Sequence, residues 1–243
     1  MSEVLVSAIS EAVGLRREAR LTAGELPLWL ARLHGSLPIG DHVKFTLSGT
    51  LPVPLDEVLK GGGFEMANGV LVRLETLPDI VSDDMRLLVC GLNPSPHAAE
   101  SGIAFSRPGN RFWPAALQSG LVTIDRDPQR ALVGHGVGFT DLVKRTTSRA
   151  NELAVTEYRT GIARLERLTA WLKPTTIIMV GLTGWRAATK SDATAGWQNR
   201  SLGGRPVYLM PNTSELNAHE TLDTLAAHLG AAQAAPPLID LAS

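Results

Sequence analysis

The sequence has one cysteine and no long apolar run, and each of these shortages excludes a class of protein. One cysteine among 243 residues forms no internal disulfide and cannot supply the roughly four thiolates that hold an iron–sulfur cluster. Cys90 lies in an apolar stretch, is typical of a small buried side chain and fits a reducing compartment. No apolar run approaches the roughly 18 residues of a membrane span, and the start lacks the basic segment of a secretory signal. We therefore expect a cytoplasmic, nucleoid-associated protein with no membrane partner.

Motifs for metals and nucleotide cofactors are also missing. The six histidines are scattered, and the chain contains neither H-E-x-x-H nor a cysteine pair. Its glycine-rich stretches lack the lysine of a P-loop and the spacing of a dinucleotide fingerprint, and no G-x-S-x-G elbow is present. The sequence therefore predicts no metal site and a reaction that needs no cofactor.

Net charge is low, but it is distributed unevenly. The chain carries −1 overall, yet residues 1–84 contain 7 Lys and Arg against 12 Asp and Glu, and residues 85–243 contain 16 against 12. A basic surface favours nucleic acid, and so modest an excess predicts salt-sensitive affinity. Ordinary variation in surface charge produces the same difference, so charge alone does not indicate DNA.

Residues 1–76 contain no pattern that we can connect to chemistry. Apolar spacing within residues 4–34 predicts two helices that are separated by a turn near residues 22–24. Alternation predicts a strand at residues 42–49 and a short strand at residues 70–74, and Gly61–Gly63 is typical of a loop. We expect a small α+β extension that packs on the rest of the chain or binds a partner.

From residue 85 onward, expected strands alternate with expected helices. Strands are predicted at 86–90, 175–180 and 206–210, and helices near 110–119, 128–134, 155–172, from 183 and 218–230. The glycines of residues 134–138 indicate a turn, and Asn217 with Glu220 fits a capping box for the last helix. This order implies an α/β three-layer sandwich with a mostly parallel central sheet. Residues 233–243, which include Pro236 and Pro237, are expected to form a loose tail.

The most informative run is residues 85–113, MRLLVCGLNPSPHAAESGIAFSRPGNRFW. Its apolar strand leads directly into Gly91 and Asn93. Glycine lets the backbone approach a ligand closely, and the residue before a proline is held away from the helical region. A polar amide thus projects from the carboxyl end of a buried strand, where open α/β sheets bind ligands.

The same run resembles the first active-site motif of the mismatch-specific uracil/thymine-DNA glycosylases, a branch of the uracil-DNA glycosylase superfamily. That motif reads G-[IL]-N-P-[GS], then a loop of small residues, a phenylalanine and P-x-N-R-F-W. Residues 210–217, MPNTSELN, match a second family motif, and the two motifs have the expected order and spacing. The resemblance covers roughly residues 70–232 and implies a glycosylase domain at 77–232 with a uracil-DNA-glycosylase-like fold. The single cysteine argues against the iron–sulfur branches of this superfamily.

The resemblance implies a role for each residue of the first motif. Asn93 positions the attacking water, because an amide oxygen accepts a hydrogen bond but is no general base. Phe105 stacks on a flipped pyrimidine, and Asn110 belongs to the pocket, although it fits a helix cap equally well. The expected substrate-binding residues are Gly91, Leu92, Pro94, Ser95, Ile103, Phe105, Asn110 and Asn212.

The second motif resembles a loop that enters the DNA duplex. By resemblance, Leu216 is the wedge that fills the space of the departed base. The other expected DNA contacts are Ser214, Glu215, Asn217, Lys144 and Arg145, the last two as phosphate ligands. Many relatives have glycine where this chain has Glu215, and some have arginine at the position of Ala218. A carboxylate near phosphates is repulsive, so these changes bear on DNA affinity and on the opposite base.

Together these residues imply a monofunctional DNA glycosylase for base excision repair, acting on double-stranded DNA. It would flip uracil, alone or with thymine and damaged pyrimidines, out of mismatched duplex DNA and hydrolyse the N-glycosidic bond. No lysine lies in either motif, so no lyase step is expected. A glycosylase with altered base scope, such as deaminated purines, and a lesion-binding protein with little turnover both remain open. We expect a monomer whose residues 1–76 are dispensable for chemistry and open to a repair partner.

Overall fold

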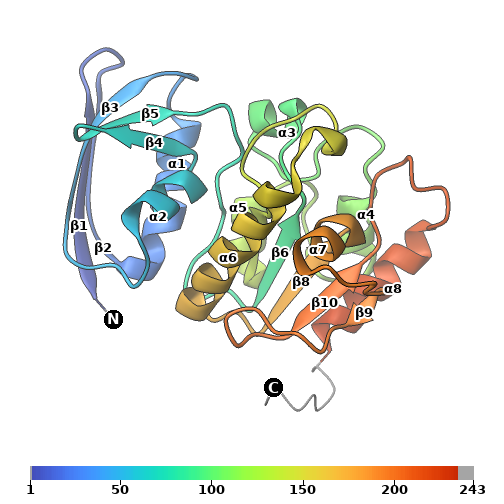
Figure 1. Cartoon of the computed structure of the whole chain (residues 1–243). Helices are drawn as coiled ribbons and strands as arrows, with labels where there is room; N and C mark the ends of the chain where they lie inside the picture. Colours follow the sequence, from blue (N-terminus) through green and yellow to red (C-terminus); the bar gives the residue numbers. More distant parts are fainter. Residues whose placement is uncertain (1, 235–243) are drawn as a thin grey trace.

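The computed structural model describes residues 2–234, and these residues form two units that lie side by side (Figure 1). Each unit is built on one five-stranded sheet: the strand order is β2-β1-β3-β5-β4 in the first and β7-β6-β8-β10-β9 in the second. Each sheet has its own apolar core. The predicted tail of residues 233–243 lies mostly outside the described residues, and Gln233 is the last residue of a helix.

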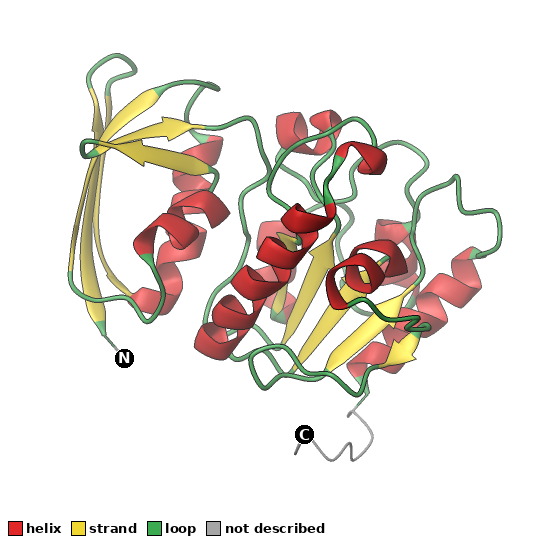
Figure 2. Ribbon diagram, in the orientation of Figure 1, coloured by secondary structure: helices red, strands yellow, loops and turns green. Residues whose placement is uncertain are grey.

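The N-terminal unit is an antiparallel sheet with two helices on one face (Figure 2). Its strands are β1 (Glu3–Ser10), β2 (Leu15–Thr22), β3 (His42–Ser48), β4 (Phe64–Ala67) and β5 (Val70–Arg73), and its helices are α1 (Leu26–Gly35) and α2 (Leu55–Gly61). The α+β character and the strand near 42–49 agree with the sequence prediction. Gly61 ends α2 instead of lying in a loop.

The prediction of two helices within residues 4–34 is wrong for its first half, which is the β1–β2 hairpin. Val4, Val6 and Ala8 are buried and their neighbours face outward, so the apolar period is two, as in a half-buried strand. Gly14, with φ +62°, lies in the turn between the strands, where glycine adopts this conformation without steric cost.

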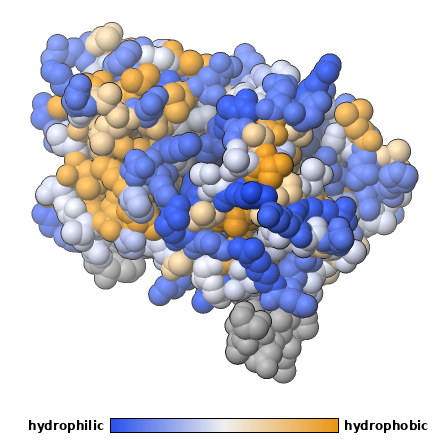
Figure 3. Space-filling model, viewed as in Figure 1, coloured by the Kyte–Doolittle hydropathy of each residue, from blue (hydrophilic) through white to orange (hydrophobic). Residues whose placement is uncertain are grey.

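The C-terminal unit has a mixed sheet between two layers of helices (Figure 2). β6 (Leu87–Gly91), β7 (Val137–Asp141), β8 (Thr176–Val180) and β10 (Val207–Met210) run parallel, and β9 (Gly196–Trp197) pairs antiparallel at the edge. α6 (Val155–Leu172) and α7 (Leu182–Thr189) cover one face, whereas α4 (Phe112–Gln118), α5 (Pro128–His135) and α8 (Leu222–Gln233) cover the other. α3 (Pro96–Ser101) lies at the carboxyl edge of the sheet. The face of the molecule seen in Figure 3 carries apolar patches over the N-terminal unit and is mostly hydrophilic over the C-terminal unit.

Several elements of this unit differ from the sequence prediction, which included neither α3 nor β9. β7 was not predicted, because a strand that reads Val-Gly-Phe-Thr-Asp is short and contains glycine. Gly138 is needed there, since a Cβ at this position would lie 2.7 Å from the sulfur of Met85. The last helix begins at Leu222 with Thr221 as its cap, not at residue 218, and Asn217 donates instead to the backbone oxygen of Asn212.

Candidate active site

A cavity of about 220 Å³ lies at the carboxyl edge of the second sheet. This volume is below the roughly 300–1000 Å³ of sites for drug-sized ligands, so it suits a single small ring system. Residues on both motifs line it, although more than 100 residues separate them in the chain. The predicted residues in the lining are Gly91, Leu92, Asn93, Pro94, Ser95, Phe105, Asn110, Asn212 and Ser214.

Asn93 has its side-chain nitrogen fixed by three acceptors. Nδ2 donates to the backbone oxygens of Pro94 and Arg145, each at 3.1 Å, and to Oγ1 of Thr147 at 2.8 Å. Carbonyl oxygens only accept hydrogen bonds, so the nitrogen and not the oxygen of the amide must face them. The other amide atom, Oδ1, has no partner among residues 2–234. The side chain thus offers one oriented acceptor at the cavity.

Phe105 has one ring face covered by protein. Its ring stacks on Phe112 with centroids 4.3 Å apart and planes at 23°, while the half-buried side chain also lines the cavity. The backbone φ of +56° is unusual for a residue other than glycine and costs about 1–3 kcal/mol, a strain that concentrates at ligand sites. Gly91 permits this packing, since a Cβ there would lie 3.4 Å from the ring and 2.5 Å from Oδ1 of Asp141.

The two motifs are joined by Arg111. Its Nη2 donates to the backbone oxygens of Ser214 at 2.9 Å and Asn217 at 2.8 Å, and its Nη1 donates to the backbone oxygen of Glu220. The preceding residue, Asn110, lines the cavity and accepts a hydrogen bond from the backbone nitrogen of Phe112 at 2.9 Å. The cap of α4 is Arg111 and not Asn110. Arg111 thus has a structural role, because its guanidinium holds the backbone of the second motif against the first.

Residues 211–217, the second-motif loop, place an apolar side chain in solvent. Leu216 is 82% exposed. Asn212 Oδ1 accepts from the backbone nitrogen of Ser214 at 2.9 Å, and Asn217 Nδ2 donates to the backbone oxygen of Asn212 at 2.9 Å. The carboxylate of Glu215 lies over Gly109 of the first motif, where a Cβ would meet it at 1.9 Å. The side chain of Leu216 is therefore held outward by a loop whose own backbone is hydrogen-bonded.

Three predicted residues lie elsewhere than expected. The prediction that Lys144 contacts phosphate does not fit its burial: its side chain is 3% exposed, and Nζ pairs with Asp79 at 2.8 Å. Arg145 is exposed, but its guanidinium bonds both carboxylate oxygens of Glu157, at 2.8 and 2.9 Å, which lowers the pKa of Glu157 to about 2. Ile103 packs against the core and is not part of the cavity lining.

Asp141 lines the cavity and was missed by the sequence analysis. It ends β7 directly opposite Gly91 and is only 5% exposed. Its Oδ2 is buried without a hydrogen-bond partner among the described residues, and burial raises the pKa of this carboxyl to about 6. An unpaired buried carboxylate oxygen costs several times an ordinary hydrogen bond and calls for an explanation. The position of Asp141 at the end of a strand could have indicated a site residue. That position could not be recognised, because β7 was not predicted.

Within residues 2–234, no cluster of three or more His, Cys, Asp or Glu side chains is arranged to hold a metal ion. No helix in that range is both long and apolar enough to cross a membrane.

A parallel sheet with its ligand cavity at the carboxyl edge is common to many enzymes, so the fold alone does not identify the chemistry. The family model of the uracil DNA glycosylase superfamily matches residues 78–233, a span that contains both motifs and the whole second sheet. The match covers more than half of the chain, and the protein belongs to the uracil DNA glycosylase superfamily.

Proposed function

We propose that this protein is a monofunctional glycosylase of the mismatch-specific branch, which hydrolyses the N-glycosidic bond of uracil in mismatched duplex DNA. The observation that carries the proposal is the fixed amide of Asn93. Its nitrogen is held by three acceptors and its oxygen is left free at a cavity that is the size of one ring system. Membership of the superfamily supports DNA as the substrate.

The first step in this proposal is extraction of the nucleotide from the helix. Enzymes that act on a base flip it into a pocket and lose the stacking energy of that base. Leu216, exposed at the tip of the second-motif loop, enters the vacated space as an apolar wedge. The free face of Phe105 then stacks on the flipped base, a contact worth about 1–3 kcal/mol.

Hydrolysis follows from the position of one water molecule. The oxygen of Asn93 accepts a hydrogen bond from this water and orients it toward the anomeric carbon, where an oxocarbenium-like transition state develops. The amide takes up no proton at neutral pH, so its contribution is orientation, with a ceiling of roughly 7–11 kcal/mol for perfect alignment. An enzyme that depends on orientation without a general base at this position is expected to be slow.

The choice of base rests in this proposal on Asp141. With a pKa of about 6, its carboxylate is ionised at pH 8 and is an acceptor only. It accepts a hydrogen bond from the ring N–H of uracil or thymine and repels cytosine, whose ring nitrogen at that position is also an acceptor. A base that leaves a buried polar group of the site unpaired is rejected more strongly than a base that differs only in size.

Asp141 also favours a second candidate, excision of deaminated purines. Hypoxanthine carries a ring N–H of the same kind, so a carboxylate accepts from it equally well. The cavity of about 220 Å³ has room for either ring system, so the choice between the two bases is left to experiment.

One panel of substrates separates these functions. Duplexes with uracil, thymine or hypoxanthine opposite guanine or adenine, and a single-stranded uracil strand, are incubated with excess protein, and free base is quantified. Release of uracil from the G·U duplex supports the proposal, and faster release of hypoxanthine supports the second candidate. Binding of every duplex without release of any base would make the protein a lesion-binding protein.

A further inference from the structure

We propose that residues 74–79, the strap between the two units, position Asn93 for catalysis, so that the N-terminal unit is a working part of the excision site. This inference rests on the proposed function of Asn93. It opposes the expectation that residues 1–76 are dispensable. Residues 74–77 of the strap also precede the span that the superfamily model matches.

The first link joins Asn93 to residues 143–147, the loop after β7. Two of the three acceptors of Asn93 Nδ2, Arg145 O and Thr147 Oγ1, belong to this loop. The backbone of the loop is fixed on the first motif, because the nitrogen of Thr147 donates to the oxygen of Pro94 at 3.1 Å. A shift of this loop would therefore displace two of the three acceptors that hold the amide of Asn93.

The second link joins the loop to the strap. Thr76 Oγ1 donates to the backbone oxygen of Lys144 at 2.5 Å, and Thr146 Oγ1 donates to the backbone oxygen of Glu75 at 2.8 Å. Lys144 Nζ donates to the backbone oxygen of Leu77 at 2.5 Å and to Oδ1 of Asp79 at 2.8 Å. Lys144 and Thr146 are thus bonded to the strap. Arg145, which lies between them, is bonded to Asn93.

The third link joins the strap to the N-terminal unit. The nitrogen of Leu74 donates to the oxygen of Gly63 at 2.9 Å, and the nitrogen of Asp79 donates to the oxygen of Gly61 at 2.7 Å. His34 lies 3.0 Å from the oxygen of Leu74 through Nε2. Burial lowers the pKa of His34 to about 4, so the neutral ring donates one hydrogen bond to this carbonyl.

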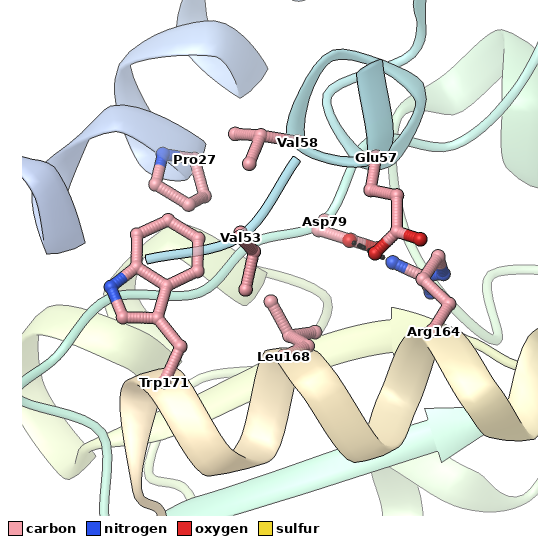
Figure 4. A pocket seen from close by; sticks show the side chains of 8 residues that line it. All are labelled: Pro27, Val53, Glu57, Val58, Asp79, Arg164, Leu168 and Trp171. Carbon is pink, nitrogen blue, oxygen red and sulfur yellow. Dashed lines mark hydrogen bonds and ion pairs between the residues drawn. The ribbon is translucent and has the colours of Figure 1, made fainter. Parts of the chain in front are cut away.

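Asp79 anchors the strap between the units. Its carboxylate accepts from Arg164 on α6 at 2.7 Å and from Lys144 at 2.8 Å, and Figure 4 shows the Arg164 pair beside Glu57 of α2. Burial alone raises the pKa of Asp79, but the two cations hold it below its usual value. Removal of one partner would leave a buried charge without compensation and unfold the region, so this cluster is unsuitable for a test of catalysis.

Thr76 provides the test, because it is buried and its hydroxyl reaches the loop. Thr76→Val keeps the volume and removes the hydrogen bond, whereas Thr76→Ser keeps the hydroxyl. Thr160→Val is the matched control, since Thr160 is exposed on α6 and bonds only its own helix, at Thr156 O. We expect single-turnover uracil excision to slow about tenfold in Thr76→Val, as for a small misplacement of a reacting group, and to stay unchanged in the other two variants. Affinity for the duplex should stay unchanged in all three.

A second variant covers a failure of Thr76→Val to fold. Thr146→Val removes the bond to Glu75 at a half-buried position and should slow excision in the same direction by a smaller factor. The pathway through Asn93 is tested in an Asn93→Asp background, where the amide donors are gone. There Thr76→Val should have no further effect. Equal slowing in both backgrounds would overturn the proposal.

A readout that does not depend on excision separates this inference from the proposed function. The side-chain amide protons of Asn93 exchange with water slowly while three acceptors hold them. In NMR spectra, Thr76→Val should speed this exchange and Thr76→Ser should not. If the chain releases no uracil but the exchange responds, the positioning stands and the proposed function fails. If the exchange and the rate are both unchanged in Thr76→Val, the positioning is overturned.

Discussion

Residues 91–110 of the first motif, the first-motif loop, and the second-motif loop meet at one cavity. The functional side chains of the first are fixed, whereas that of the second is exposed. Asn93 is fixed by three hydrogen bonds, and Phe105 by a stacked ring behind it. Leu216, by contrast, is 82% exposed, and its backbone nitrogen donates to Oγ of Ser214 within the same loop. Orientation of a reacting group demands a fixed side chain, whereas insertion into DNA demands a side chain free to leave water. Changes in the first loop should therefore act on the excision rate, and changes in the second on DNA binding.

Asn93→Ala tests the fixed side of this comparison with the largest expected effect. Loss of the oriented acceptor should slow single-turnover uracil excision by at least about 100-fold. Duplex affinity, measured by gel shift, should stay within about tenfold of wild type, because the amide acts on the transition state more than on the bound ground state. A variant that excises at the wild-type rate would remove Asn93 from the mechanism.

Phe105→Ala should have the next largest effect. The lost stacking is worth about 1–3 kcal/mol, so excision from the duplex should slow roughly tenfold or more. The same change relaxes the backbone strain at φ +56° only slightly, because alanine shares the steric limits of other L-residues. Thermal melting serves as the control for folding. A variant that melts cooperatively and excises uracil at the wild-type rate would contradict the stacking role of Phe105.

Asp141→Asn should act in opposite directions on rate and on stability. Burial raises the pKa of Asp141 to about 6, so the native state holds its proton more tightly than the unfolded chain. The stabilising protonated form is present at low pH and is lost as pH rises through about 6. Asparagine should therefore stabilise the protein at pH 8, by up to about 2–3 kcal/mol, and have little effect at pH 4.

Asp141→Asn should also change the excision rate and its dependence on pH. At pH 8, Asp141→Asn should slow uracil excision about tenfold, which corresponds to one hydrogen bond to a charged acceptor. The wild-type rate should fall as pH drops through about 6, and the variant should lack that step. A wild-type profile that is flat between pH 5 and pH 8 would remove Asp141 from base recognition.

Glu215→Gln tests the exposed loop with the smallest effect. Removal of a charge near phosphates should tighten duplex binding a few-fold at low ionic strength, and the gain should fade as salt screens the charge. The single-turnover rate should not change. Weaker binding by the glutamine variant would instead show that the carboxylate, which lies over Gly109, makes a specific contact to a base edge.

The sequence predicted the parts of this structure that depend on local pattern. The helix at 155–172 appears at the predicted residues as α6, because its apolar period persists over five turns. Residues 3–22 form a hairpin where the sequence predicts a helix, since Val4, Ile9 and Val13 happen to fit a helical period. Short strands with glycine, such as β7, give too few positions to set a period, and that loss also hid Asp141.

Local sequence pattern also cannot predict which side chains are buried by partners that are distant in the sequence. The resemblance predicts Lys144 as a phosphate ligand, but its partner Asp79 lies 65 residues earlier in the chain. The contacts of Asn93 to residues 145 and 147 likewise close over more than 50 residues. Resemblance thus predicted the motif residues that line the cavity, but it missed Asp141 and wrongly included Ile103. The contacts that hold these side chains came from the structure.

Product analysis on one substrate shows whether this protein hydrolyses the N-glycosidic bond of uracil. A duplex with a single G·U mismatch is incubated with excess full-length protein at pH 8, and free uracil and the state of the DNA strand are followed over time. We expect stoichiometric release of uracil from an intact strand that then carries one abasic site. A stable complex in which the uracil stays attached to its sugar would contradict it.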